Sequence, residues 1–360
     1  MHLADLLKSI QALGARPNHG ARVLRRWVQC LPQNSSHQRV EDFLSRPVRN
    51  ALPGLLSQWS NLARLVEQHA GEDGSARLLL ELRDGQTVES VLLPRDGLCV
   101  STQVGCAVGC VFCMTGQGGL LRQLGSAEIV AQVVLARTLR PVHKVVFMGM
   151  GEPAHNLEAV LDAIHFLGTE GQIGHKNLVF STVGDRRAFE RLPLGVVKPA
   201  LALSLHSTVA ERRARLLPRA PRLDPEELVA LAEDYARRTR YPIQYQWTLM
   251  AGVNDDEVEI EGIARLLRGK YAVLNLIPYN TVPGLEFRRP AQAQANEMAR
   301  RLHEHGVLTK LRDSAGQDVE AGCGQLRARV QTVQLHARAN TPPDQALHAS
   351  LPGATASVLP

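Results

Sequence analysis

The sequence predicts an α/β fold: a partial barrel of six β/α units, preceded by a small helical domain and a β-hairpin linker. From residue 98 onward, short β-rich runs alternate with amphipathic segments, a pattern typical of parallel strands joined by crossover helices. Before residue 71, apolar residues recur at helical spacing between polar loops. A chain of 360 residues, 44% of them hydrophobic, can bury one large core and one small one.

The expected elements follow in chain order. The predicted domains are a helical accessory domain at 1–70, a hairpin linker at 71–97, the barrel at 98–336 and a disordered tail at 337–360. The hairpin is predicted because two β-rich runs, 76–82 and 86–93, flank an Asp-Gly pair. Barrel strands are expected near 98–102, 143–149, 177–182, 199–205, 243–250 and 271–277. Crossover helices are expected near 126–139, 157–168, 224–239, 255–268 and 290–305.

Composition and charge narrow the class of protein. The first residues are interrupted by charge too early for a signal peptide, and no apolar run reaches the ~20 residues of a membrane span, so we expect a cytoplasmic protein without a membrane partner. In that reducing compartment, the six cysteines are interpreted as ligands and catalysts, not as a disulfide framework. The net charge of +6 is compatible with a polyanionic partner.

Two arginine clusters stand out against this modest charge. They are either a nucleic-acid contact surface or ordinary solvated faces, and the sequence alone leaves both open. The clusters are Arg22, Arg25 and Arg26, and then Arg212, Arg213, Arg215, Arg219 and Arg222.

Three cysteines within eight residues are the strongest signal of chemistry. Cys106, Cys110 and Cys113 have the spacing CxxxCxxC, which can bind three irons of a 4Fe-4S cluster and leave the fourth iron open for a small molecule. The alternatives are a structural zinc site or three unrelated buried thiols. Structural zinc uses four ligands, usually in two separated pairs, and the chain has too few cysteines in that pattern. The spacing resembles the radical SAM signature, in which S-adenosylmethionine binds the open iron.

Polar residues follow several other predicted strands, at the edge where a barrel carries its active site. Taken one at a time, each is an ordinary turn or capping residue. Taken together, they predict a cofactor-binding surface, called the cofactor bed below. They are Gly151 and Glu152 in a Gly-Glu-Pro bend, then Ser181, then Ser204, Leu205 and His206, and finally Asn280.

Two cysteines outside the cluster motif make the resemblance more specific. Cys99 precedes the cluster motif, and Cys323 stands in the Gly-rich segment Ala-Gly-Cys-Gly-Gln-Leu. With Gly-Met-Gly-Glu-Pro at 149–153, Leu-Ser-Leu-His at 203–206, Gly-Val-Asn-Asp at 252–255 and Ile-Pro-Tyr-Asn at 277–280, these motifs resemble the RlmN/Cfr family of adenine RNA methyltransferases over residues 3–335. Cys30 matches no motif and is interpreted as a core residue of an apolar helix face.

The resemblance implies a reaction and a role for each residue. One 4Fe-4S cluster per chain, on Cys106, Cys110 and Cys113, cleaves S-adenosylmethionine, which is both methyl donor and radical source. Cys323 accepts a methyl group, and the 5'-deoxyadenosyl radical activates that methyl for addition to an sp2 carbon, carbon 2 in the leading hypothesis. Glu89 then removes the ring proton, and Cys99 releases the RNA by a transient disulfide with Cys323.

The cofactor contacts carried over from the family are Gly151, Glu152, Ser181, Ser204, Leu205, His206 and Asn280. The implied partners are ribosomal or transfer RNA and an electron donor such as flavodoxin or ferredoxin, and we expect a monomer. An unpaired adenosine is expected, since a base inside a duplex could not reach a cluster in a barrel.

Some positions depart from the family pattern. Met114 stands where a small residue is usual, Gly116 and Gly118 alter the following turn, Ala315 replaces an arginine, and Gln246 replaces an acidic residue. Two alternatives therefore stay open: a paralogue that methylates another RNA or carbon 8, and an iron–sulfur RNA-binding protein without catalysis.

Overall fold

Parallel strands joined by helices form the main part of the molecule. The structure, a computed structural model, describes residues 1–328. The predicted tail at 337–360 and the end of the predicted barrel domain lie outside the described residues. Met1–Arg327 form one compact unit. Within the described residues, none of the helices combines the length and the apolar character that crossing a membrane would need.

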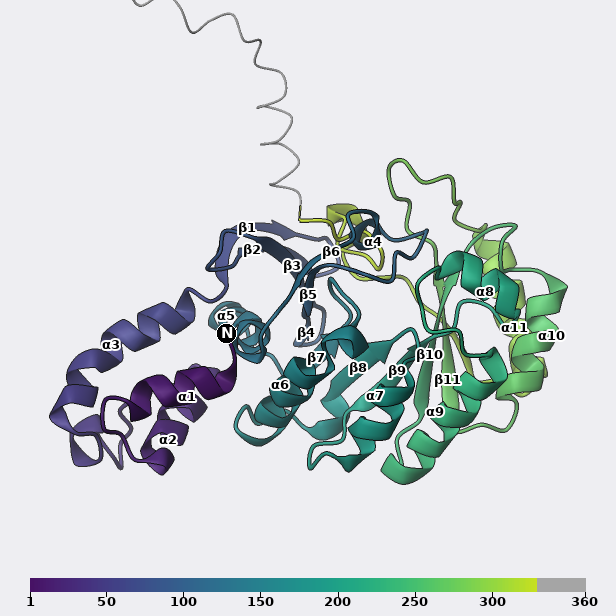
Figure 1. Ribbon diagram of the computed structural model, residues 1–360. Coiled ribbons are helices and arrows are strands. Elements are labelled where there is room, and N and C mark those ends of the chain that lie inside the picture. The colour runs from purple at the N-terminus through teal and green to yellow at the C-terminus, as the bar shows by residue number, and fades with distance from the viewer. Residues whose placement is uncertain (329–360) are drawn as a thin grey trace, which may run out of the picture. The chain divides into compact units, whose positions relative to one another are not determined.

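A single sheet of ten strands organises this unit (Figure 1), in the order β1-β2-β3-β4-β7-β8-β9-β10-β11-β12. Its parallel strands are β4 (Gly97–Cys99), β7 (Lys144–Phe147), β8 (Leu178–Thr182), β9 (Ala200–Ser204), β10 (Ile243–Leu249), β11 (Ala272–Pro278) and β12 (Thr309–Leu311). Each parallel strand lies beside the next one along the chain, as in a singly wound barrel. The predicted α/β class with a partial barrel is confirmed, and β12 adds one strand that was not predicted.

The crossover helices follow the strands closely. Figure 1 shows α5, α6, α7 and α9 in a row along one face of the sheet. The helices after β4 are α4 (Met114–Gln117), α5 (Ser126–Leu139), α6 (Leu157–Thr169), α7 (Arg186–Arg191), α8 (Ala210–Leu216), α9 (Pro225–Thr239), α10 (Glu257–Leu267) and α11 (Gln292–Glu304). A separate two-stranded sheet, β5 (Gln103–Gly105) with β6 (Leu120–Gln123), encloses the cysteine motif.

The predicted hairpin is present, but it continues the large sheet and is not a separate linker. β2 (Ala76–Glu81) pairs with β3 (Thr87–Leu93), and β3 pairs in turn with β4. An additional strand, β1 (Arg64–Ala70), pairs with β2 in residues that we had assigned to the helical domain. The helical part therefore ends earlier, at Ser60.

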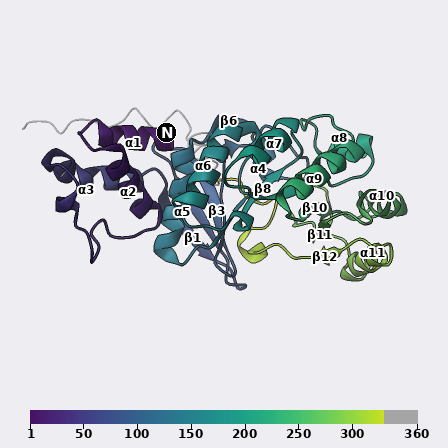
Figure 2. The same ribbon diagram turned by 90° about the horizontal axis from the view of Figure 1, so that it is seen from below.

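Three helices precede the sheet: α1 (Leu3–Gln11), α2 (Pro17–Val28) and α3 (Arg46–Ser60). They lie beside α5 at one end of the sheet (Figure 2). Because they cover the side of α5 that faces away from the sheet, α5 is buried at almost every position of its first half and has no polar face there. The edge contact between Trp27 and Trp59, with ring centroids 5.6 Å apart, closes the small core of these helices.

Candidate active site

The cysteine motif forms a loop between β5 and α4, and glycine allows its tight entry. Cys106 N–H donates to the carbonyl of Gly119 at 2.9 Å. Gly105, with φ of +77°, lies so close to this strand that a Cβ would stand 2.0 Å from the Gly119 oxygen. A side chain at Gly105 would therefore displace the start of the loop.

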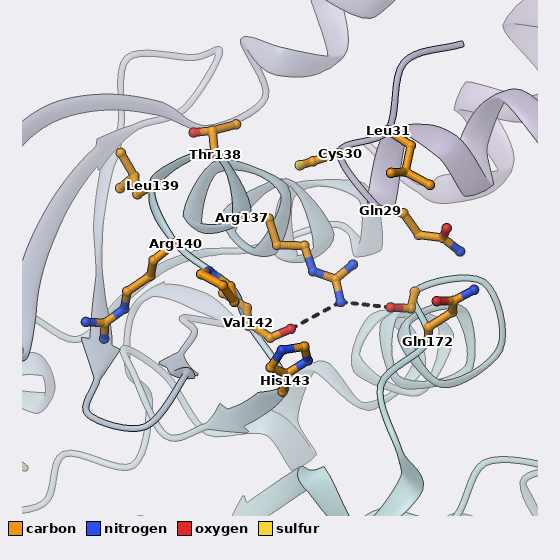
Figure 3. A pocket seen from close by; sticks show the side chains of 12 residues that line it. Gln29, Cys30, Leu31, Arg137, Thr138, Leu139, Arg140, Val142, His143 and Gln172 are labelled. Atoms are coloured by element: carbon orange, nitrogen blue, oxygen red, sulfur yellow. Dashed lines mark hydrogen bonds between the residues drawn. The ribbon is translucent and has the colours of Figure 1, made fainter. Parts of the chain in front are cut away.

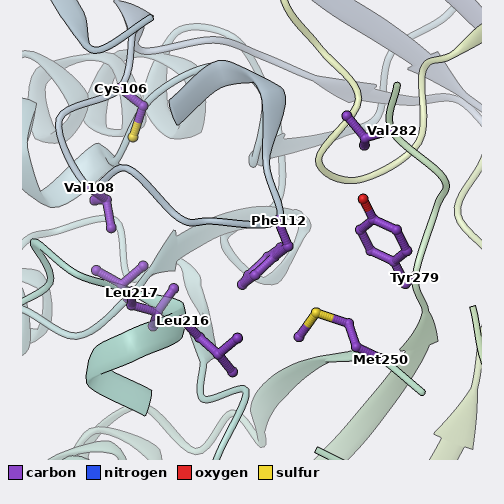
Figure 4. Packing of buried hydrophobic residues seen from close by; sticks show 9 residues of the cluster. Cys106, Val108, Phe112, Leu216, Leu217, Met250, Tyr279 and Val282 are labelled. Carbon is purple, nitrogen blue, oxygen red and sulfur yellow. The ribbon is translucent and has the colours of Figure 1, made fainter. Parts of the chain in front are cut away.

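An apolar cluster packs against the loop (Figure 4), which itself contributes three of the buried members. Its buried members are Cys106, Val108, Phe112, Val183, Leu216, Leu217, Met250, Tyr279 and Val282, and Cys110 and Cys113 contact its edge. A low-polarity surrounding strengthens electrostatic interactions inside it and keeps solvent from reactive species.

The three thiols of the loop lie close together. Burial raises the pKa of Cys106 to about 12, and burial followed by the proximity of Cys113 and Cys106 raises the pKa of Cys110 well above its usual value. Within residues 1–328, no group of three His, Cys, Asp or Glu side chains converges on one metal ion. In a 4Fe-4S cluster each cysteine binds a different iron, so its thiols stand farther apart than the ligands of one ion. Three neighbouring free thiols in apolar surroundings fit such a cluster.

The predicted cofactor residues lie at the carboxyl ends of the parallel strands. Glu152 is buried; its two carboxylate oxygens accept hydrogen bonds from Ala154 N–H at 3.1 Å and from Val183 N–H at 3.0 Å. Burial raises the pKa of Glu152 to about 7. A cationic group of a ligand, such as an ammonium group, would offset the free-energy cost of burying the charged carboxylate. Gly151, with φ of +104°, brings the chain so close to Gln103 that a Cβ would stand 2.6 Å from that side chain.

Strand register places the polar residues on one face of the sheet. Cross-strand partners lie on the same face, and Ser204 is level with Gln246, which is level with Asn275. Ser181 is level with Ala202 and therefore shares that face. The amide Nδ2 of Asn275 is buried without a hydrogen-bond partner in the described part of the chain.

His206 and Leu205 follow β9. His206 has a left-handed backbone, with φ of +60°, and its Nδ1 accepts from Thr248 N–H at 3.0 Å. Burial lowers the pKa of His206 to about 3, so the ring is neutral, and its edge contacts Phe112 at a centroid distance of 5.0 Å. Leu205, fully buried, donates its N–H to the carbonyl of Gln246. This turn links the cofactor bed to the apolar cluster around the thiols.

Arg213 is a site residue that the sequence analysis assigned to a surface cluster. It is 4% exposed, and its Nη2 donates to the carbonyl of Val183 and to that of Ser204. Burial lowers the pKa of Arg213 to about 10, an effect opposed by the proximity of Cys110 and Glu152. The cation therefore lies between the thiol loop and the cofactor bed. Its Nε is buried without a partner among the described residues, so a bound anion could still accept from it.

Cys323 lies on a segment that is tied to the thiol loop. Gly324 accepts a hydrogen bond from Met114 N–H at 2.8 Å, and the carbonyl of Leu326 accepts one from the Thr115 hydroxyl at 2.7 Å. Asn280, at the end of β11, donates from Nδ2 to the carbonyl of Cys323 at 3.0 Å. Cys323 itself is exposed, so its thiol is accessible.

Cys99 and Glu89 complete the group. Burial raises the pKa of Cys99, and the proximity of Cys323 raises it further, so the two thiols are neighbours although both are free. Glu89 on β3 is 1% exposed, and Arg77 Nη1 lies 2.6 Å from its Oε1. Val91 is level with Cys99, so Glu89, two residues before Val91, shares the face of Cys99. The structure thus brings Cys323, which is distant in the chain, to Cys99 and to the face that carries Glu89.

Cys30 stands apart from this group. It lies after α2, is exposed, and its thiol donates to the carbonyl of Val134 at 3.2 Å. It lines an open cavity of about 530 Å³ (Figure 3) that also involves the end of α5. There Arg137 donates to the carbonyls of Val142 and Gly171, so its guanidinium joins elements of the scaffold. This cavity lies away from the other five cysteines, and the prediction that Cys30 is a core residue is wrong for its exposed side chain.

Comparisons with known proteins agree with this geometry. The model of the radical SAM superfamily matches residues 100–261. A probable RNA methyltransferase of Leptothrix cholodnii is 70% identical over 91% of this chain and 95% of its own length. One of Azoarcus sp. is 68% identical over 95% of this chain and 99% of its own. The crystal structure of a radical SAM methyltransferase from Sphaerobacter thermophilus matches with a TM-score of 0.80 at 34% identity, covering 91% of this chain and 98% of that one. The chain therefore belongs to the radical SAM superfamily and, within it, to the methyltransferase family of these relatives.

Proposed function

We propose that this protein methylates carbon 2 of an unpaired adenosine in ribosomal or transfer RNA, through a methyl group carried by Cys323. One observation carries the proposal: Cys323 and Cys99 are neighbours beside the thiol loop, and a buried glutamate shares the face of Cys99. A methyltransferase with ordinary polar chemistry needs neither the loop nor the second thiol. The names of the relatives in bacteria support RNA as the substrate.

The residues divide the work among binding, methyl carriage and proton transfer. Cys106, Cys110 and Cys113 would hold a 4Fe-4S cluster, and Glu152 would receive the ammonium group of S-adenosylmethionine, with Gly151, Ser181, Ser204, Leu205, His206 and Asn280 around it. When bound, the cluster and S-adenosylmethionine supply a 5'-deoxyadenosyl radical, which removes one hydrogen atom from a methyl group. The chain's own task is to present that methyl group and to release the product.

Cys323 presents the methyl group, and Cys323 and Cys99 together release the product. As a thiolate, Cys323 takes a methyl group from one S-adenosylmethionine, leaving S-adenosylhomocysteine. The activated carbon joins the adenine ring as a radical adduct, which gives up its unpaired electron to the electron-donor system as Glu89 accepts the ring proton, and this leaves a closed-shell thioether between Cys323 and the ring. The thiolate of Cys99 then attacks the sulfur of Cys323, so that a sulfur–sulfur bond forms as the carbon–sulfur bond breaks, and the released carbon takes a proton. A dithiol reductant restores both thiols with two electrons.

Several details belong to the same proposal. Reducing equivalents come from a flavodoxin- or ferredoxin-like protein, the chain acts as a monomer, and it works in the cytoplasm, where free thiols persist. The alternative is methylation at carbon 8 or of another RNA. Gln246 favours this alternative, because it stands on the same face as Ser204 at a position where the family has an acidic side chain.

The proposal is tested by incubating the reduced protein anaerobically with S-adenosylmethionine and RNA that lacks the modification. We expect 5'-deoxyadenosine, S-adenosylhomocysteine and 2-methyladenosine, which mass spectrometry of digested RNA distinguishes from 8-methyladenosine. In Cys99→Ala, we expect a covalent protein–RNA complex that survives denaturation. RNA binding without any of these products would contradict the proposal and support the non-catalytic alternative.

A further inference from the structure

Arg77, on β2, lies at the centre of contacts that no sequence motif indicated. In the hairpin register, Leu79 is level with Glu89 and Arg77 is level with Val91, so Arg77 and Glu89 are diagonal neighbours on one face. The Nη1 of Arg77 lies 2.6 Å from Oε1 of Glu89. Their side chains are 6% and 1% exposed, so this ion pair is removed from water.

The same guanidinium also holds the segment that carries Cys323. Its Nε donates to the carbonyl of Val319 at 2.8 Å. The other oxygen of Glu89, Oε2, accepts from the backbone N–H of Arg327 at 2.6 Å. Val319 and Arg327 stand on either side of Cys323 in the chain, so the Arg77–Glu89 pair contacts that segment before and after its thiol.

A buried carboxylate needs a counter-charge or hydrogen-bond donors in place of the water it has lost. The guanidinium of Arg77 and the backbone N–H of Arg327 supply these to the two oxygens of Glu89 and fix the direction of its carboxylate. Arginine is charged at every accessible pH, and its planar fork can bind a carboxylate and a carbonyl at once, which the ammonium of lysine does less well.

We propose that Arg77 is a positioning residue of this site: it orients the carboxylate of Glu89 and holds this base in register with the Cys323 segment. The inference rests on the proposed function, because it assigns Arg77 to the step in which Glu89 takes the proton from the ring carbon. In that step the electron pair of the carbon–hydrogen bond stays on the ring, and the proton moves to the carboxylate. Arg77 does not touch the substrate.

The test compares Arg77→Gln and Arg77→Lys with the wild type in single-turnover reactions of the reconstituted protein with RNA. We expect all three to hold the same iron content, to carry a methyl group on Cys323 and to form 5'-deoxyadenosine at the same rate. The covalent protein–RNA complex should then decay roughly 100-fold more slowly in Arg77→Gln at neutral pH, with Arg77→Lys in between. Arg64→Gln is the matched control, because Arg64 on β1 pairs with Glu81 on β2 at an exposed position, and it should behave as the wild type.

The conservative variant separates loss of the Arg77 contacts from general damage. Arg77→Lys keeps a positive charge but lacks the planar fork that contacts Glu89 and the carbonyl of Val319 at once. Partial rescue of the decay by lysine, with an unchanged rate of 5'-deoxyadenosine formation, is the result that a merely structural role of Arg77 would not give.

Each outcome is decisive. Decay at the wild-type rate in Arg77→Gln, or 5'-deoxyadenosine formation slowed to the same extent as the decay, would overturn the inference. If Arg77→Gln does not fold, Arg77→Lys decides: decay several-fold slower than in the wild type, with unchanged 5'-deoxyadenosine, supports the inference, and an unchanged decay rate overturns it. A wild-type protein that gives no methylated adenosine overturns the proposed function itself, and the role of Arg77 with it.

Discussion

At the scale of single residues, His206 of the cofactor bed lowers the stability of the folded protein in acid. Its ring is buried and its pKa is lowered to about 3, so the folded protein leaves it neutral where the unfolded chain would bind a proton. Because the unfolded state binds more protons below pH 6.5, the free energy of unfolding falls as pH drops through that value. His206 therefore lowers stability in acid and has almost no such effect at pH 7.5.

Replacing His206 by Asn should remove this dependence. Asn tolerates the left-handed backbone at this position and does not titrate. We expect the loss of unfolding free energy between pH 7.5 and pH 6.0 to be smaller in His206→Asn by roughly 0.8 kcal/mol. Urea unfolding at both pH values measures it. An equal loss in both proteins would mean that the ring binds a proton in the folded state.

The thiol loop gives a second prediction at this scale. We propose that Cys106, Cys110 and Cys113 are the iron ligands, so each alanine variant should lose the brown chromophore and most of its iron after anaerobic reconstitution. Cys30→Ala is the control, because Cys30 is exposed and far from the loop. Full iron and sulfide in the triple variant would contradict the assignment of the ligands.

Two arginines show where residue patterns are insufficient. Arg213 stands on α8 among other arginines. Nothing in the sequence distinguishes this buried arginine from its more exposed neighbours. Arg77 could have been found: the Asp-Gly turn fixes the hairpin register, and the register makes Arg77 a diagonal neighbour of Glu89. The closeness of Cys99 and Cys323 could not be derived from local patterns, because it depends on contacts across the whole barrel.

At the scale of elements, the segment that carries Cys323 depends on a glycine. A Cβ at Gly322 would stand 2.7 Å from Nδ2 of Asn280 and 2.8 Å from Oε1 of Gln325. Nδ2 of Asn280 donates to the carbonyl of Cys323, and Oε1 of Gln325 accepts from the N–H of Gly322. The first bond holds the segment against the residues that follow β11, and the second closes a turn within the segment, where Gln325 Nε2 also donates to the carbonyl of Thr281.

We expect Gly322→Ala to slow methyl transfer to Cys323 by about tenfold or more, since a displaced thiol loses its orientation for attack. Iron content should not change. Gly118→Ala is a suitable control, as no heavy atom lies within 4 Å of the position where its Cβ would be. Labelled methyl transfer, followed by peptide mapping, gives both rates. Equal rates in the two variants would show that the position of the segment does not limit the transfer.

The elements that the sequence predicted are those with a strong periodic signal. The six expected barrel strands and the five expected crossover helices all have counterparts within a few residues. β1 was missed because it is mostly exposed on both faces and shows no apolar alternation. β12 has three residues and is a strand only because β11 offers it a partner edge. Both depend on neighbours that local sequence does not encode.

At the scale of the whole molecule, the arginines of the N-terminal helices connect parts of the protein. Arg25 pairs with Glu170 at the end of α6, Arg22 lies over the ring of Phe43 at 4.8 Å, and Arg26 donates to backbone carbonyls of the following loop. The sequence left open whether this cluster contacts nucleic acid or is a solvated face. These contacts give the three arginines a structural task, so we expect phosphate-binding arginines elsewhere.

The arginines that follow β9 are better placed for that task. Arg215, Arg219 and Arg222 are exposed and form no ion pair with a carboxylate in the part of the chain that the structure describes. Arg219 donates to the carbonyl of Ala107 inside the thiol loop, at 3.3 Å. Arg215 lines a cavity of about 380 Å³ together with Val111 of the same loop. A phosphate beside the site would therefore meet unpaired positive charge here.

Replacing Arg215, Arg219 and Arg222 by Gln should weaken RNA binding and reduce its dependence on salt. Each phosphate contact releases counterions, so the slope of log K against log salt should become shallower by about 0.7 to 0.9 for each arginine that binds a phosphate. The matched variant replaces Arg22, Arg25 and Arg26 by Gln; we expect a nearly unchanged slope and a lower free energy of unfolding, because these side chains connect structural elements. Binding isotherms at several salt concentrations measure both slopes. If the slope decreases more in the N-terminal variant than in the other variant, the phosphates contact the helical domain, and the arginines near the thiol loop serve another purpose.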